Sequence, residues 1–310
     1  MTAAILGTMI VLLLLGFPMM VPLIMGAMVG FVTIFGGFSQ LETMVQQVIA
    51  GIQPASLIAV PMFIFAADLM TRGQSAERLI DLVMAFLGHM KGGLAISTAG
   101  ACTMFGAVSG STQATVVAVG GPLRPRLLKA GYSDQFTLAL IINASDIAFL
   151  IPPSIGMIIY GVVSGTSISE LFIAGIGPGL LILLLFSIYA YIYAVRHNVP
   201  TEPAASWAER GRAIRRALWP LGFPAIIIGG IYGGVFSPTE AAAACVLYAL
   251  LLEMVVFREL SLKQLYATAK STGLITAVVF VLVGAGTAFS YIISFAQIPQ
   301  AILGGIGIDG

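Results

Sequence analysis

A short polar stretch, residues 109–115, interrupts an apolar part of the chain. Six of its seven residues are glycine or carry a polar side chain: Ser109, Gly110, Ser111, Thr112, Gln113 and Thr115. Hydroxyls, together with backbone carbonyls that a turn frees from helical bonding, are the oxygen ligands that an alkali cation needs. The N-terminus of a helix that follows such a turn favours an anion. The stretch predicts a site for small ions; the alternative is a kinked helix whose small residues let a neighbour pack closely.

The motif at 151–154, Ile151, Pro152, Pro153 and Ser154, is a second candidate element. Two adjacent prolines remove two backbone donors and crowd the preceding turn, so a helix that reaches them must open. An opened helix exposes carbonyl oxygens, and broken helices form ion and substrate sites in many membrane proteins. The motif therefore predicts carbonyl ligands, against the simpler interpretation of a kink.

Polar residues also precede the prolines by about two helical turns, including Asn143 and Asp146. An acidic side chain at the centre of a membrane helix costs ~2.5–3.5 kcal/mol on insertion scales and usually marks function. Asp146 is a candidate cation ligand, proton carrier or partner of a polar group on a neighbouring helix. We assign Asn143 and Asp146, with Thr112, Gln113 and Thr115, to substrate binding or coupling.

The amino-acid composition indicates that these candidate residues lie in a membrane protein. Apolar residues make up 59% of the 310 residues and charged residues only 9%, against about 25% charged residues in soluble domains. Most of the surface must therefore face a lipid bilayer. The formal net charge of +1 gives no reason to expect nucleic acid. Cys102 and Cys245 lie in apolar runs and are interpreted as packing residues, not as a disulfide or metal framework.

The apolar runs predict an all-α polytopic membrane protein. A membrane β-barrel would alternate polar and apolar residues, and these runs do not. A helix needs ~20 residues to cross a bilayer, so the first run is long enough for two crossings, divided near Gly16, Phe17 and Pro18. The runs are 3–37, 41–69, 93–123, 132–163, 170–196, 217–236, 240–257 and 272–296.

The positions of the basic residues predict on which side of the membrane each connecting segment lies. All 14 Lys and Arg residues lie in four segments: 72–91, 124–129, 196–216 and 258–270. The positive-inside rule places such segments in the cytoplasm. With the N-terminus outside and two crossings in 3–37, all four reach the cytoplasm if 93–123 enters the membrane and returns as a re-entrant hairpin.

A single full crossing at 93–123 would instead place every later basic cluster outside. Two short crossings would restore the sidedness, but neither half reaches ~17 residues without a break. The charge pattern therefore predicts a hairpin with residues 109–115 at its tip, and an amphipathic arm at 72–91 on the cytoplasmic side. Irregular backbone at membrane depth is tolerated where protein or a water-filled cavity surrounds it.

At these residues the chain resembles the large membrane subunit of tripartite ATP-independent periplasmic (TRAP) transporters, within the wider ion-transporter superfamily. The resemblance covers nearly all 310 residues, and its motifs are specific in combination. They are FGAVSGSTQATVVAVGG at 105–121, LKAGYS at 128–133, IPPS at 151–154, AGIGPGLL at 174–181 and FSPTEAAAACVLYALL at 236–251.

The resemblance implies an elevator-type transporter with inverted repeats, in which a mobile domain carries re-entrant hairpins past a static scaffold. It implies import of small organic acids across a bacterial inner membrane, with Na⁺ as the coupling ion and no cofactor. It also implies a small four-helix membrane partner and a periplasmic substrate-binding protein. Carried over by position, the first sodium site would use Ser109, Gly110, Ser111, Ile151, Pro152, Pro153 and Ser154.

The same resemblance implies a division into functional segments. Residues 1–92 would form scaffold spans and the amphipathic arm, and 93–163 the hairpin and broken helix of the transport domain. Residues 164–216 would hold a span and a cytoplasmic basic loop, and 217–310 the start of an inverted second repeat.

Two departures from the family are visible. The family usually has a small or hydroxyl residue where this chain has Asp146. Its members also continue for roughly another third of this length, so a second hairpin and a second proline-opened helix are expected after residue 300.

Other functions remain open at this point. One is a stand-alone ion or dicarboxylate transporter of the same superfamily, and another is a purely structural membrane subunit. An intramembrane enzyme is a remote alternative, because an aspartyl protease would need two intramembrane aspartates and only Asp146 is central. Glu240 follows Ser237, Pro238 and Thr239, so we interpret it as the first-turn acid of a capped helix.

Overall fold

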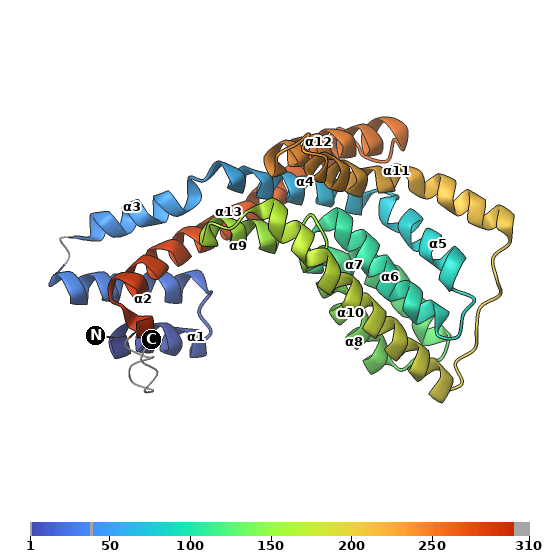
Figure 1. Cartoon of the computed structure of the whole chain (residues 1–310), viewed down its shortest axis with the longest axis horizontal. Coiled ribbons are helices and arrows are strands. Elements are labelled where there is room, and N and C mark those ends of the chain that lie inside the picture. Colours follow the sequence, from blue (N-terminus) through green and yellow to red (C-terminus); the bar gives the residue numbers. More distant parts are fainter. Residues whose placement is uncertain (1, 38–39, 301–310) are drawn as a thin grey trace. The chain divides into compact units, whose positions relative to one another are not determined.

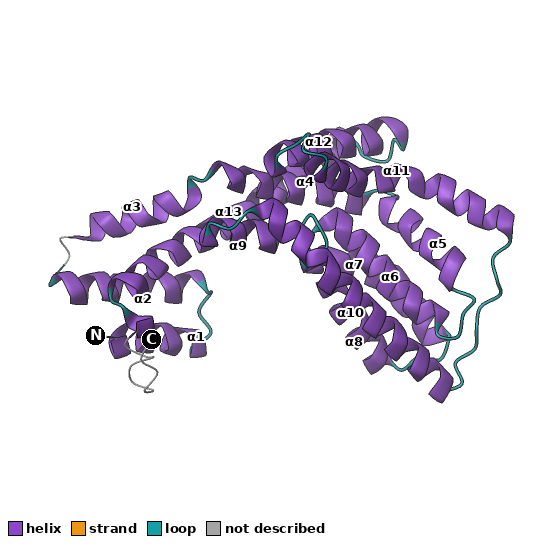
Figure 2. Cartoon of the chain, viewed as in Figure 1, coloured by secondary structure: helices purple, strands orange, loops and turns teal. Residues whose placement is uncertain are grey.

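The computed structural model describes residues 2–37 and 40–300, and these residues form helices joined by short loops (Figure 2). No strand occurs among them. The all-α prediction is therefore confirmed. The chain divides into two compact units, Met1–Leu57 with Leu274–Gly310 and Ile58–Gly273, and Figure 1 labels the helices of both.

The first unit contains the divided N-terminal run. The predicted division of 3–37 is confirmed, because α1 (Thr2–Leu14) and α2 (Met20–Phe35) are separate helices that pack on each other. The unit also contains α3 (Leu41–Ile52) and the C-terminal part of α13 (Leu262–Phe295). Small residues allow close packing: a Cβ placed on Gly26 of α2 would lie 2.9 Å from the ring of Phe289 on α13. Small residues at helix contacts are a common solution in membrane proteins.

One interpretation was wrong, that 41–69 forms a single span. Helix α3 ends at Ile52, and after Pro54 the chain forms the short 3₁₀ turn η2 (Ala55–Ile58) and helix α4 (Ala59–Arg72). Pro54 has no backbone N–H to continue the helical hydrogen bonds, and its ring crowds the carbonyl one turn earlier, which explains a boundary at this position.

The second unit is built around α6 (Gly93–Ser109), whose residues are all buried except Met104. This helix contacts six other helices of the unit, which are α4, α5 (Ser75–Leu87), α7 (Thr112–Lys129), α8 (Asp134–Ser145), α10 (Ile168–Arg196) and α11 (Trp207–Tyr232). Its sequence is rich in Gly, Ala, Ser and Thr, so neighbouring backbones approach it closely.

The unit also contains α9 (Ile155–Ser164), the N-terminal part of α13, and α12 (Pro238–Leu250), which continues into the π-helical turn η4 (Leu251–Val256). The predicted arm at 72–91 is helical in α5, and it buries one face at Ala76, Leu79, Ile80 and Val83. Helix α5 packs against α11.

Five helical segments among the described residues are long and apolar enough to cross a membrane: Ala55–Arg72, Ile168–Arg196, Trp207–Tyr232, Pro238–Val256 and Leu262–Phe295. Two of them begin about ten residues earlier than the apolar runs at 217 and 272. The basic residues of 210–216 are therefore helical, although the sequence suggested a loop. The cause is local, because Ser206 and Glu209 form a capping box that starts α11 at Trp207.

The functional division at residues 92, 163 and 216 stays a prediction. The expected second hairpin and second opened helix lie outside the described residues. The interpretation of Glu240 is confirmed, because Ser237 caps α12 and the Glu240 carboxylate accepts from the Ser237 backbone N–H at 2.8 Å.

We expect Ser237→Ala to lower the free energy of unfolding by about 1 kcal/mol, because it removes the acceptor for the Glu240 backbone N–H at the start of α12. Thr239→Ala is the matched control in the same turn. Thermal unfolding of the purified protein in detergent measures both. Equal melting temperatures for the two variants would contradict the capping role.

Candidate functional site at the hairpin tip

Helices α6 and α7 form a helical hairpin, and the turn between them consists of Gly110 and Ser111. The hairpin predicted from the charge pattern is thus present in the fold; its depth in a membrane stays a prediction. Gly110 has φ +58°, a left-handed conformation that glycine adopts without penalty. A Cβ on Gly110 would also collide with the carbonyl oxygen of Pro153. Glycine is required at the tip for both reasons.

Most hydroxyls of the tip bond to one another. The Oγ of Ser109 and the Oγ1 of Thr115 are 2.9 Å apart, and both side chains are fully buried. Thr115 also donates to the carbonyl of Ser111 at 2.9 Å. The Oγ of Ser111 caps α7 by accepting from the backbone N–H of Ala114. These bonds fix the turn, so the three hydroxyls have structural partners.

The predicted opening of the next helix is confirmed. Helix α8 ends at Ser145, continues as the 3₁₀ turn η3 (Asp146–Phe149), and leaves helical geometry before Ser154 begins α9 as its N-cap. The Oγ of Ser154 accepts from the backbone N–H of Met157 at 3.2 Å. The opening therefore starts at Asp146, earlier than the prolines alone indicate.

The hairpin tip and the opened helix contact each other. The backbone N–H of Ile155 donates to the carbonyl of Gly110 at 3.4 Å. One turn earlier on α6, a Cβ placed on Gly106 would lie 2.9 Å from the Cα of Ala148. The structure thus brings together the two groups of residues, 109–111 and 151–154, that the sequence assigned to one sodium site.

Several oxygens at this contact have no partner among the described residues. The Oγ1 of Thr112 is buried and accepts and donates no hydrogen bond. The carbonyls of Ile151, Pro152 and Pro153 also accept none there. Buried polar groups normally find partners, so these oxygens are available to a bound cation. Helices α6 and α8 end near this contact, and helices α7 and α9 begin there. Helix C-termini carry negative and N-termini positive partial charge, so both signs are present.

The other assigned residues lie on the outside of this contact. Gln113, Asn143 and Asp146 are exposed. The amide of Asn143 donates to the carbonyl of Ala139 at 2.7 Å, and the amide oxygen of Gln113 accepts from Ser111 at 3.1 Å. Asp146 is therefore not part of the buried contact between Gly110 and the prolines.

Glu253 is a candidate that the sequence reasoning missed. Its side chain is fully buried in the π-helical turn η4, and the hydroxyl of Ser75 donates to its Oε1 at 2.6 Å. Its Oε2 has no partner among the described residues, and Gly73 leaves room for it. The available signal was a single acid inside the apolar stretch LLEMVVF, since buried acids and π-turns both concentrate at functional positions.

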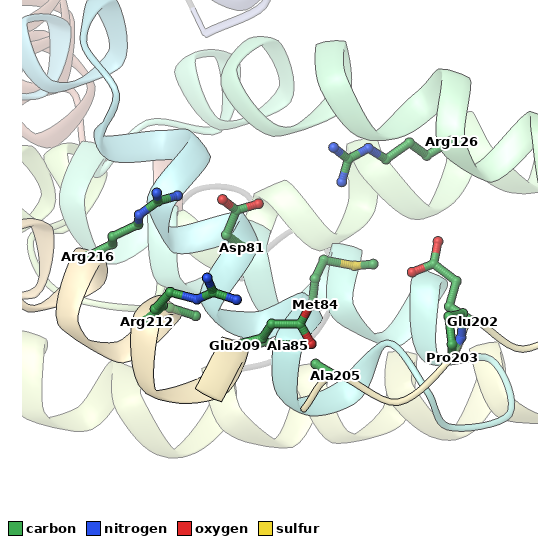
Figure 3. Close-up of a pocket in the computed structure, with 11 residues that line it drawn as sticks. Asp81, Met84, Ala85, Arg126, Glu202, Pro203, Ala205, Glu209, Arg212 and Arg216 are labelled. Atoms are coloured by element: carbon green, nitrogen blue, oxygen red, sulfur yellow. The ribbon is translucent and has the colours of Figure 1, made fainter. Parts of the chain in front are cut away.

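A separate cavity of about 520 Å³ lies where α5, α7 and α11 converge. Figure 3 shows the guanidinium groups of Arg126, Arg212 and Arg216 and the carboxylate of Asp81 extending into it. Burial raises the pKa of Asp81, with a smaller contribution from Glu77, while Arg126 and Arg216 oppose the rise. The cavity gathers basic residues of two segments, 124–129 and 196–216, at one place in the fold.

Comparison with known proteins identifies the family. The model of the family described as "Tripartite ATP-independent periplasmic transporter, DctM component" matches residues 6–305. The chain belongs to this family of TRAP transporter large permeases.

Curated relatives agree. The "Ectoine/5-hydroxyectoine TRAP transporter large permease protein UehC" of Ruegeria pomeroyi is 79% identical over 99% of this chain and 72% of the relative. The "Ectoine TRAP transporter large permease protein TeaC" of Halomonas elongata is 74% identical over 100% of this chain and 72% of its own length. The "C4-dicarboxylate TRAP transporter large permease protein DctM" of Pseudomonas aeruginosa is 39% identical over 80% of this chain and 58% of its own length.

Membership in the DctM family confirms the predicted resemblance and makes the chain a membrane-spanning permease subunit, not an enzyme. The intramembrane-protease alternative is thereby set aside.

We expect Gly110→Ala to reduce transport by the complete transporter to about a tenth or less, because the added Cβ strains a left-handed residue by roughly 1–2 kcal/mol and meets the Pro153 carbonyl. Gly121→Ala is the control, since it lies in the same hairpin with open space around its Cα. Initial uptake rates and melting temperatures measure the two variants. Normal transport by Gly110→Ala would contradict the contact.

We expect Asp81→Asn to stabilise the protein at neutral pH. The pKa of Asp81 is raised in the folded state, so ionisation favours the unfolded chain, and the wild type loses stability as the pH rises through that pKa. The asparagine variant lacks this loss. Between pH 4 and pH 8, the melting temperature of the variant should exceed that of the wild type by an amount that grows with pH. A difference that is largest at the acidic end would contradict the assignment.

Proposed function

We propose that this chain is the large permease of a sodium-coupled TRAP transporter that imports ectoine and 5-hydroxyectoine. The observation that carries the proposal is the contact between Gly110 at the hairpin tip and Ile155 after the opened helix. It places unpaired oxygens from two chain segments at one point of the fold. The names of two relatives, 79% and 74% identical to this chain, are the basis for the substrate.

The cation would lie between the tip and the opened segment. Candidate ligands are the Thr112 hydroxyl and the carbonyls of Ile151, Pro152 and Pro153, whose oxygens lack partners among the described residues. The C-terminal end of α6 adds negative partial charge at this place. The side chains of Ser109, Ser111 and Ser154 would shape the site through their hydrogen bonds and helix caps. Their backbone carbonyls would be further oxygen ligands. Each Na⁺ that moves inward gains about 2.3 kcal/mol per 100 mV of membrane potential.

The substrate is a zwitterion, and the site can accommodate its carboxylate. Ectoine has a carboxylate at one end and a cationic cyclic amidine at the other. Helices α7 and α9 both begin at the contact, at the N-caps Ser111 and Ser154, and helix N-termini bind carboxylates through their free N–H groups. A substrate carboxylate beside a bound Na⁺ would gain from both, so ion and substrate binding would support each other.

The other expected features of the family belong to this proposal. Transport would use an elevator movement of the hairpin-bearing domain in a bacterial inner membrane, with the N-terminus in the periplasm. A small four-helix subunit would bind laterally, and a periplasmic binding protein would deliver the substrate. Helix α10 presents a broad apolar surface for lipid or the small subunit, with Leu180, Leu181, Leu184, Leu185 and Ile188 each about half exposed.

Uptake of radiolabelled ectoine into proteoliposomes tests the proposal. The liposomes contain the large permease in its complete length and the small subunit, and the binding protein is added outside. We expect uptake with an inward Na⁺ gradient and none with K⁺ or choline in its place. Uptake that is indifferent to Na⁺ would remove the coupling, and uptake of C4-dicarboxylates in preference to ectoine would remove the substrate assignment. Uptake without the small subunit would favour the stand-alone alternative.

We expect Thr112→Val to raise the Na⁺ concentration for half-maximal uptake by about threefold to tenfold, since one oxygen ligand of the cation is lost while the shape is kept. Thr137→Val is the matched control, because its hydroxyl is also buried without a partner among the described residues but lies on α8, away from the tip. A shift of the same size in both variants would contradict a special role for Thr112.

A further inference from the structure

Measured along the axes of α7 and α8, Asp146 lies close to the level of the hairpin tip. It is on the exposed side of the opened helix. Helices α7 and α8 pack antiparallel, and a Cβ on Gly120 would lie 2.8 Å from Ile141. A helix rises about 1.5 Å per residue, so five residues beyond Ile141 bring Asp146 to the level of Thr115. Asp146 is thus about one turn below the tip.

The side chain of Asp146 is exposed, and its neighbours on the same face include the exposed Asn143 as well as apolar residues. It shares its exposed helical face with Ile142 and Phe149, whose side chains are 49% and 43% exposed. The ion pairs within the described residues are Arg72–Asp68 and Arg124–Asp134, and neither includes Asp146. The nearest basic residue on α7 is Arg124, which pairs with Asp134 at the other end of α8.

The exposed Asp146 carboxylate, which forms no ion pair among the described residues, is suited to bind a cation. If this face lies at membrane depth, as the charge pattern predicts, an unpaired charge on it is costly, and the cost is offset when an opposite charge binds. The buried oxygens assigned to sodium lie at the Gly110 contact, whereas Asp146 is exposed and outside it. Among the described residues Asp146 therefore has no cationic partner, and its carboxylate is accessible from the exposed side.

We propose that the Asp146 carboxylate binds the cationic amidine of the substrate and selects zwitterions over simple organic anions. This inference rests on the proposed function, because that proposal supplies a substrate with a cationic ring. A cyclic amidinium offers two N–H groups in one plane, and a carboxylate accepts such a pair in the way it accepts an arginine. The substrate then spans from Asp146 to the helix N-termini at the tip, with its negative end towards Ser111 and Ser154.

The selection follows from charge alone. A dicarboxylate in the same position would place a second negative charge beside Asp146, and like charges at short range weaken binding. An uncharged ring would leave the acid without a partner. A zwitterion satisfies both ends of the site.

Equilibrium binding of radiolabelled ectoine to the purified complex of large and small subunits, at saturating Na⁺, tests this role. We expect Asp146→Asn to weaken ectoine binding by about tenfold to a hundredfold, the range for loss of a charged hydrogen-bonding partner. Asp146→Glu retains the charge and should lose less. Asp134→Asn, an acid on the same helix that pairs with Arg124, is the matched control and should bind as the wild type does.

Sodium and a neutral analogue separate a substrate contact from other roles. The Na⁺ concentration for half-maximal binding should stay unchanged in Asp146→Asn. Pyroglutamate, a cyclic carboxylate with a neutral ring amide, should compete with ectoine better in the variant than in the wild type. Should Asp146→Asn not yield a monodisperse complex, Asp146→Ser takes its place in the same assay.

The outcomes are distinct. Wild-type ectoine affinity in Asp146→Asn, or a shifted Na⁺ requirement with unchanged ectoine affinity, overturns the role of Asp146 and leaves the proposed function standing. A wild-type complex that binds no ectoine overturns the proposed function itself, and this inference with it.

Discussion

The fold of the second unit depends on one close contact, where the turn at Gly110 meets the backbone around Pro153. Backbone can approach backbone here because Gly110 has no side chain and because the prolines keep the opposing segment out of helical geometry. Helix α6, buried along almost its whole length, holds the turn in place from within. Without that enclosed helix, neither the turn nor the opened segment would keep its unpaired oxygens away from water.

The same contact explains how one small region could serve ions of both signs. The C-terminal end of α6 and the N-terminal ends of α7 and α9 converge at residues 109–112 and 154–155. Helix ends bring about half an elementary charge each without a charged side chain. A site built this way needs few ionised residues, which agrees with a chain in which 9% of residues are charged. An acid such as Asp146 then stands out as the exception that needs its own explanation.

Features fixed by local chemistry could be predicted from the sequence. The opening at Pro152 and Pro153 and the cap at Ser237 follow from what these residue types permit in the backbone, whereas the turn near Gly110 was predicted from the distribution of the basic residues. Features fixed by distant contacts could not. The partner of Glu253, Ser75, lies 178 residues away. The hydroxyls of Ser109 and Thr115 bond to each other, whereas that of Thr112 has no partner among the described residues. This difference depends on three-dimensional geometry, which the spacing of residues in the sequence does not reveal. The early start of α11 was readable in the capping pair Ser206 and Glu209, but the arginines that follow favoured a loop.

The two cysteines have a practical consequence for experiments on sidedness. Cys102 and Cys245 are both fully buried and form no disulfide. Water-soluble maleimides should therefore leave Cys102 and Cys245 unmarked in the folded protein. A single new thiol at an exposed position, such as Gln113 or Lys91, would report which compartment reaches it without prior removal of the native pair.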